Sequence, residues 1–173
     1  MERENTHGSS VNPHEVTLRR ASLADHAQAC RLTDSVDALH RQHLPWLFEK
    51  PDAQPRSEAY FADLLKRDDA GVFVADAGRV VGIAFGLLRW APEFPVFKRQ
   101  RWGVIDGLVV DPAWRRLGIG KRLTQAVETW ALESGAPWVE LNVYEFNAEA
   151  RRFYEALGYL PVLTKLRRPS DGP

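Results

Sequence analysis

Residues 115–120, with the sequence RRLGIG, decide the fold of this chain. They follow residues 104–110, whose apolar, β-branched composition is typical of a buried strand, and they open an amphipathic pattern over residues 118–134 that is typical of a helix. A strand, a short turn and a glycine-containing helix start direct several backbone N–H groups toward one point, where the helix dipole also favours negative charge. The stretch therefore predicts a site for a phosphorylated ligand.

The rest of the chain predicts helices and strands on both sides of this turn. Prolines 45, 51 and 55 make residues 37–55 irregular. Strands are expected at residues 15–19, 72–76, 80–88, 104–110, 138–144 and 159–167, and helices at residues 22–36 (with Ser22 as N-cap), 58–67, 118–134 and 147–157. This order predicts an α/β (α+β) fold in which helices cover both faces of a mixed sheet.

Length, charge and cysteine content narrow the class of protein. The 173 residues suit one domain, expected over residues 15–173, behind a flexible polar tail at residues 1–14. A formal net charge of zero argues against a dedicated nucleic-acid binder. The single Cys30 predicts a reducing compartment and acts as a small core residue. With no signal peptide and no apolar run long enough for a membrane, we expect a cytoplasmic protein.

Two familiar glycine motifs do not fit the turn. A P-loop requires a glycine where Arg115 stands and a serine or threonine where Arg122 stands. A dinucleotide-binding fingerprint requires a third glycine and a mainly parallel sheet, whereas three expected strands precede this turn. The phosphate site therefore belongs to another class.

Two segments resemble the GNAT superfamily of N-acetyltransferases. Residues 110–120, VDPAWRRLGIG, resemble its acetyl-CoA signature, V-x-P followed by R/Q-x-x-G-x-G/A. A second family pattern, V-x-x-x-N-x-x-A-x-x-x-Y-x-x-x-G-F/Y, is matched by Val143, Asn147, Ala150, Tyr154, Gly158 and Tyr159. The resemblance covers residues 15–167 and implies a mixed, mostly antiparallel sheet of six to seven strands, with helices on both faces and a splay between the fourth and fifth strands.

The resemblance also implies how acetyl-CoA binds. The pantetheine arm would lie along the fourth strand, where the Val110 amide would also contact the thioester oxygen, and the pyrophosphate would sit on the glycine turn. Asn147 has an alternative role as a helix N-cap, Asn142 as an exposed strand residue, and the two glycines as simple turn formers. The implied cofactor-binding residues are Leu108, Val109, Val110, Arg115, Arg116, Leu117, Gly118, Ile119, Gly120, Lys121, Asn142, Asn147 and Tyr154.

Tyr154 and Asp106 are the candidate catalytic residues. The family pattern implies that Tyr154 protonates the departing thiolate, although its helical spacing also suits a core aromatic. Strand alternation places Asp106 on one face with Val104, Leu108 and Val110, where burial would raise the pKa of its carboxyl group and favour a general base. The alternative is a carboxylate that only orders local hydrogen bonds.

The implied reaction is direct acetyl transfer from acetyl-CoA to the primary amine of a small molecule. A protein N-terminus or lysine is an alternative acceptor, and a non-catalytic acyl-CoA-binding regulatory module is an alternative of another class. His40 and His43 have no apparent third ligand, so no metal is expected; a homodimer joined through the last strand is compatible with the family. The residues expected to border the acceptor, or else to fill the core or an interface, are His40, His43, Trp46, Phe48, Trp90, Glu93, Phe94 and Phe97.

Overall fold

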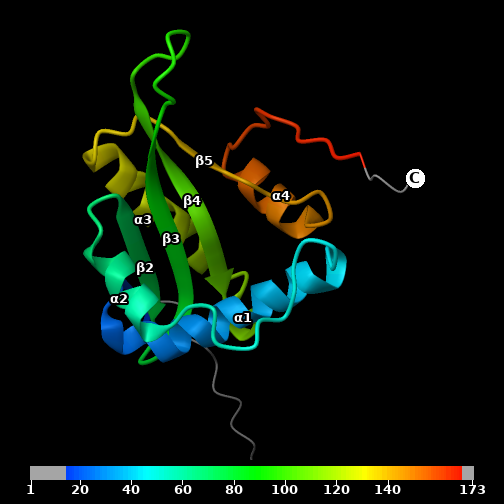
Figure 1. Cartoon of the computed structure of the whole chain (residues 1–173). Coiled ribbons are helices and arrows are strands. Elements are labelled where there is room, and N and C mark those ends of the chain that lie inside the picture. Colours follow the sequence, from blue (N-terminus) through cyan, green and yellow to red (C-terminus); the bar gives the residue numbers. More distant parts are fainter. Residues whose placement is uncertain (1–14, 169–173) are drawn as a thin grey trace, which may run out of the picture. The chain divides into compact units, whose positions relative to one another are not determined.

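Figure 1 shows the computed structural model of the chain, which describes residues 15–168. The described residues form two compact units, residues 15–142 and residues 143–168. The tail predicted at residues 1–14 lies outside the described residues.

One sheet organises the first unit. Its strands are β1 (Thr17–Arg20), β2 (Ala70–Asp76), β3 (Val80–Trp90), β4 (Arg101–Val110) and β5 (Val139–Leu141), arranged in the order β1-β2-β3-β4-β5. The pairs from β1 to β4 are antiparallel, and β5 joins β4 in parallel. The predicted mixed, mostly antiparallel sheet is confirmed, with five strands rather than six or seven in residues 15–168.

Helices cover both faces of this sheet. Successive residues of β3 point to opposite faces, and each face packs against different helices. Ile83 packs in the core cluster with Leu32 of α1 (His26–His43) and Phe61 of α2 (Glu58–Lys66). A methyl group at Gly82, the preceding position, would lie 3.0 Å from Leu123 Cδ1 of α3 (Ile119–Glu133). The two helical layers therefore hold the middle of the sheet, and β4 within it, from opposite sides.

Several predicted elements differ from the structure; the strand expected at residues 138–144, for example, covers only Val139–Leu141. The helix expected to end at residue 36 continues to His43, because the first residue that interrupts it is Pro45. The strand expected at residues 159–167 is wrong, since that segment has no regular secondary structure. Pro161 removes an N–H donor there, and Leu160 and Val162 are 81% and 91% exposed. In this second unit the one helix of the described residues is α4 (Ala148–Ala156).

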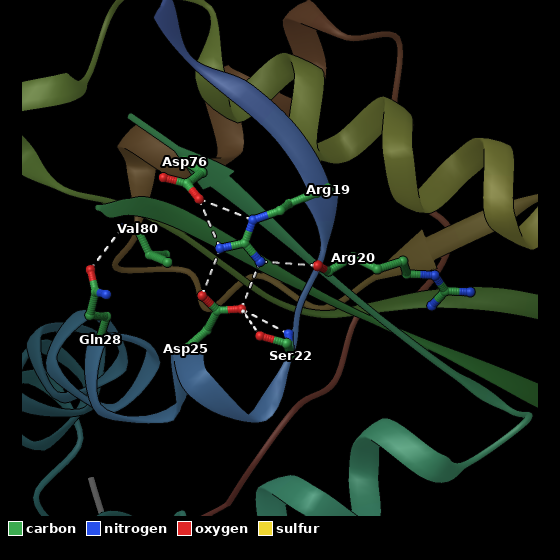
Figure 2. A network of polar contacts seen from close by, with 7 residues as sticks. All are labelled: Arg19, Arg20, Ser22, Asp25, Gln28, Asp76 and Val80. Carbon is green, nitrogen blue, oxygen red and sulfur yellow. Dashed lines mark hydrogen bonds and ion pairs between the residues drawn. The ribbon is translucent and has the colours of Figure 1, made fainter. Parts of the chain in front are cut away.

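An ion-pair network ties the start of α1 to the edge of the sheet (Figure 2). Arg19 of β1 donates from both terminal nitrogens to the two carboxylate oxygens of Asp25, each at 2.8 Å, and also contacts Asp76 at the end of β2. Arg19 holds the pKa of the buried Asp25 carboxyl below its usual range. This network therefore stabilises the fold above about pH 4 and is lost as the pH falls through the lowered pKa.

Candidate active site

The two edges of β4 are paired to different extents. Along one edge β4 pairs with β3 from Arg101, opposite Trp90, to Val110, opposite Gly82. Along the other edge β5 pairs only with residues from Gly103 to Ile105. Residues 106–110 therefore have an edge that β5 does not cover, which confirms the predicted splay between the fourth and fifth strands.

Backbone alternation shows which amides face this uncovered edge. The Asp111 amide donates to Val81 O at 2.8 Å, so the next residue whose amide faces β3 is Val109. The amides of Leu108 and Val110 point to the opposite edge. Of the three strand residues predicted to bind the cofactor, Leu108 and Val110 present backbone donors there, whereas the Val109 side chain is buried in the core.

A β-bulge changes the predicted place of Asp106. Ile105 lies opposite Gly86 and Gly107 lies opposite Phe85, so Asp106 is an extra residue with no partner across the pair. The bulge reverses the alternation, and Val104 no longer shares a face with Leu108. Asp106 is exposed, which makes the prediction of a buried carboxylate wrong.

The glycine turn begins with a capped helical turn directly after β4. The Asp111 side chain accepts a hydrogen bond from the Ala113 amide at 3.1 Å and caps the short 3-10 helix η3 (Pro112–Trp114). Pro112 suits the first helical position because the missing N–H would have no partner there. Asp111 had no predicted role, although an aspartate before a proline is a recognisable N-cap signal in the sequence.

The turn then adopts two left-handed backbone conformations before α3 begins. Arg116 has a φ of 65° and Gly118 a φ of 77°. The Arg122 amide bonds to Gly118 O at 3.1 Å and closes the first turn of α3, so the amides of residues 119–121 precede the helical ladder. A methyl group at Gly118 would meet no atom within 4 Å. The turn therefore presents backbone donors on an open side, an arrangement suited to an anion.

The side chains of the turn differ in their surroundings. Ile119 is 2% exposed and anchors the start of α3 in the core, so it offers only its backbone to a ligand. Arg115, Arg116 and Lys121 are exposed. Arg122 instead donates to Val16 O at 2.9 Å, which gives it a structural role at the edge of the sheet.

The second unit places Tyr154 on α4. Its side chain is 9% exposed, and burial raises the pKa of the phenol, which stays protonated at neutral pH. Its ring contacts those of Phe153 and Tyr159 at centroid distances of 5.0 and 5.5 Å. Asn147 accepts a hydrogen bond from the Ala150 amide at 3.1 Å, which confirms its predicted N-cap role.

Two other predicted residues lie in the first unit. Asn142 is exposed and follows the end of β5, so it is not a residue of that strand. Cys30 is buried, and burial raises the pKa of its thiol, in agreement with the predicted core role.

The predicted acceptor residues come from the segment around the end of α1, from the end of β3 and from the loop between β3 and β4. The ring of His40 stacks on Phe48 at a centroid distance of 5.1 Å, and burial lowers the pKa of this histidine. Trp90, Phe94 and Phe97 are each more than half exposed, so these three aromatics do not fill the core of the chain. Their exposure leaves them available to a ligand or a partner.

The chain matches known proteins over most of its length. The model of the acetyltransferase (GNAT) family matches residues 36–159. An uncharacterized N-acetyltransferase of Archaeoglobus fulgidus is 39% identical over 114 residues, which are 65% of this chain and 71% of the relative. The L-ornithine N5-acetyltransferase NATA1 of Arabidopsis thaliana is 33% identical over 109 residues, which are 62% of this chain but only 47% of the relative.

Solved structures share the fold. A crystal structure of a tetramutant of the BH1408 protein from Bacillus halodurans superposes with a TM-score of 0.82 at 24% identity, covering 88% of this chain and 99% of that one. Within residues 15–168, no helix combines the length and apolar character needed to cross a membrane. Since the family model covers well over half of the chain and the relatives are N-acetyltransferases, this protein belongs to the GNAT acetyltransferase family and is an acyltransferase.

Proposed function

We propose that the protein transfers the acetyl group of acetyl-CoA directly to a primary amine of a small molecule. The observation that carries the proposal is that two groups of backbone donors follow each other in the chain, one at the uncovered edge of β4 and one in the glycine turn after η3. The amides of Leu108 and Val110 suit an extended pantetheine arm, and those from Arg116 to Gly120 suit its pyrophosphate. The predicted Arg115 amide instead donates to Pro112 O at 3.4 Å. Lys121 adds positive charge near the phosphates.

The reaction forms a C–N bond and breaks a C–S bond. The amine nitrogen attacks the thioester carbonyl, and the Val110 amide stabilises the negative charge that develops on its oxygen. The thiolate of CoA then leaves and takes a proton, while the new amide nitrogen loses one. This chemistry uses no metal ion.

We assign the two proton transfers to Tyr154 and Asp106. The protonated phenol of Tyr154 suits a proton donor to the thiolate, and a Tyr154→Phe variant with full turnover would remove that role. Asp106 is exposed, so it would accept the proton of the amine through water rather than as a buried base. Asn142 and Asn147 are the further candidates for contacts with the pantetheine amides.

Several classes of amine fit the proposed reaction as acceptors. Exposed aromatics on the β3–β4 loop suit the apolar part of an amine, and the Arabidopsis relative is named for acetylating ornithine. A small diamine or amino acid is therefore the first class to test. A peptide N-terminus or lysine is the alternative acceptor, distinguished by including peptides in the same panel.

Thermal unfolding with CoA and acetyl-CoA, followed by an acceptor panel, tests the proposal. A ligand at about 100 times its dissociation constant stabilises the folded state by roughly 2.7 kcal/mol, so both should raise the unfolding midpoint. Release of free thiol with an amine, above the rate without it, would support the transferase. No shift with either ligand would overturn the cofactor assignment, and a shift without acetyl transfer to any amine would favour a regulatory acyl-CoA-binding module.

A further inference from the structure

We infer that Asp111 is a positioning residue that sets the affinity of the glycine turn for the pyrophosphate of CoA. The inference rests on the proposed function, because it concerns the same ligand. Asp111 would touch no ligand atom itself. It would act by fixing the backbone between the end of β4 and the first left-handed residue of the turn.

The first part of this role lies in the backbone around Asp111. Its amide donates to Val81 O at 2.8 Å, and its carbonyl accepts from the Trp114 amide at 2.8 Å. One carboxylate oxygen, Oδ1, accepts from the Ala113 amide at 3.1 Å. Main chain and side chain together therefore fix where the chain leaves the sheet.

The second part lies in the other carboxylate oxygen. Oδ2 of Asp111 accepts from Nη1 of Arg31 at 3.4 Å and from Nη1 of Arg79 at 3.2 Å. Burial alone would raise the pKa of Asp111, which is 8% exposed, but the Ala113 amide and the two guanidinium groups outweigh burial and lower it. The carboxylate is thus charged and held from two directions at neutral pH.

The two arginines are supported by the rest of the fold. Arg31 belongs to α1 and also donates to Val80 O at 3.3 Å, while Gln28 of the same helix accepts from the Val80 amide at 2.7 Å. Figure 2 shows this Gln28–Val80 contact beside the Arg19–Asp25 network that holds the start of α1. Asp111 is therefore connected to α1 and to the turn between β2 and β3, which are themselves joined through Val80.

The glycine turn needs fixed ends because its backbone is strained. Arg116 has a positive φ without being a glycine, a conformation that persists only where its surroundings enforce it. The buried Ile119 holds the C-terminal end of the turn. On the N-terminal side, the carboxylate of Asp111 links the chain to α1 and to the β2–β3 turn.

Removing the Asp111 carboxylate distinguishes a positioning role from a purely electrostatic one, because the two roles predict opposite changes in the affinity for CoA. Losing a negative charge leaves Arg31 and Arg79 unbalanced close to the turn, so electrostatics alone predicts tighter binding of an anion. The positioning role predicts weaker binding, since the backbone donors would no longer be held together. Asp111→Asn keeps an oxygen that can cap η3 but loses the charge that holds the arginines.

The test measures dissociation constants by calorimetry for CoA and for pantetheine, which lacks the pyrophosphate. We expect Asp111→Ala, which removes both the helix cap and the charge-assisted contacts, to weaken CoA binding about tenfold, or about 1.4 kcal/mol. Asp111→Asn, which removes only the charge-assisted contacts, should weaken it about threefold. Pantetheine binding should stay within twofold. The matched control is Asp69→Asn, which removes an exposed arginine–aspartate pair with Arg67 and should leave both constants unchanged.

The outcomes test the positioning role of Asp111 separately from the proposed binding of acetyl-CoA. Tighter or unchanged CoA binding in the Asp111 variants would overturn the positioning role and leave the acetyl-CoA assignment intact. An equal loss of CoA and pantetheine affinity would also overturn it, because it would indicate general damage to the unit. If Asp111→Ala does not fold, the closely isosteric Asp111→Asn gives the same comparison. Wild-type protein that binds no CoA would overturn both the positioning role and the proposed function.

Discussion

The two halves of β4 differ in pairing although they belong to one strand. In the first half, residues Gly103 to Ile105 pair with both β3 and β5, and in the second half, from Gly107 to Val110, the strand pairs with β3 alone. The bulge at Asp106 separates the halves. The first half contributes to the stability of the sheet, while the second leaves amide groups directed to an uncovered edge, where a ligand backbone can take the place of a strand.

This difference shows where the sheet provides chemistry. In the paired half, the residues mainly contribute to packing. Gly103, for example, lies so close to α3 that a methyl group there would be 2.7 Å from Ala131 Cβ. In the uncovered half, the backbone itself carries the proposed donors, and the glycine turn continues the series. We therefore expect changes to backbone groups to have larger effects on turnover than changes to most side chains of the same segment.

The largest expected effect comes from removing the Val110 amide. Val110→Pro deletes a donor that faces the uncovered edge but leaves the β3 bonds of its neighbours in place. Turnover should fall about a hundredfold to a thousandfold, as for the loss of one oxyanion donor. The measurement is release of free thiol from acetyl-CoA at saturating concentrations of an amine found in the acceptor panel.

A proline in the paired half is the comparison for this variant. The Gly103 amide donates to Trp138 O at 2.9 Å, so by alternation the amide of Val104 faces β3. Val104→Pro should lower the midpoint of thermal unfolding far more than Val110→Pro does. Equal destabilisation by the two prolines, or full turnover in Val110→Pro, would contradict the assigned difference between the halves.

The correctly predicted parts of this region are those that depend on a few residues adjacent in the sequence. The glycine turn at Gly118 and the helix that starts there are predicted correctly, whereas the cap at Asp111 and Pro112 has an equally local signal that the prediction overlooked. The apolar, β-branched composition of residues 104–110 also predicts a strand correctly. Local patterns of this kind depend on a few neighbouring residues, which is why they are readable from one chain.

Features that depend on pairing with distant residues are not readable in the same way. The apolar pattern of residues 104–110 gives no sign of the extra residue at Asp106. The bulge nevertheless places the residues before it on the opposite faces of the sheet from those expected, and it exposes the Asp106 carboxylate. Residues 159–167 have a strand-like composition but no strand partner in the structure. Asp111 forms ion pairs with Arg79 and Arg31, which are 32 and 80 positions away in the sequence. No pattern in the neighbouring residues indicates these pairs.

Asp106 itself provides the second prediction, at the boundary between the halves. If it accepts the amine proton through water, Asp106→Asn should lower kcat/KM about a hundredfold, the lower end of what general base catalysis provides. The acidic limb of the pH–rate profile should disappear with it. A variant that keeps this limb would show that the amine loses its proton to solvent, and the bulge would then serve only to separate the halves.

The smallest effect is expected at the glycine turn, where one backbone conformation is changed and no donor is removed. Gly118→Ala places a side chain at a φ of 77°, which costs about 1–2 kcal/mol and should raise the dissociation constant of CoA about tenfold by shifting the turn. Gly135→Ala is the matched control at the other end of α3, because Gly135 has the same φ and its added methyl group would meet the flexible end of Arg101. Both variants should lose similar stability in thermal unfolding, but calorimetry should show weaker CoA binding only for Gly118→Ala. Equal affinities in the two variants would mean that the turn is a structural connection rather than the place where the uncovered half of β4 delivers its ligand.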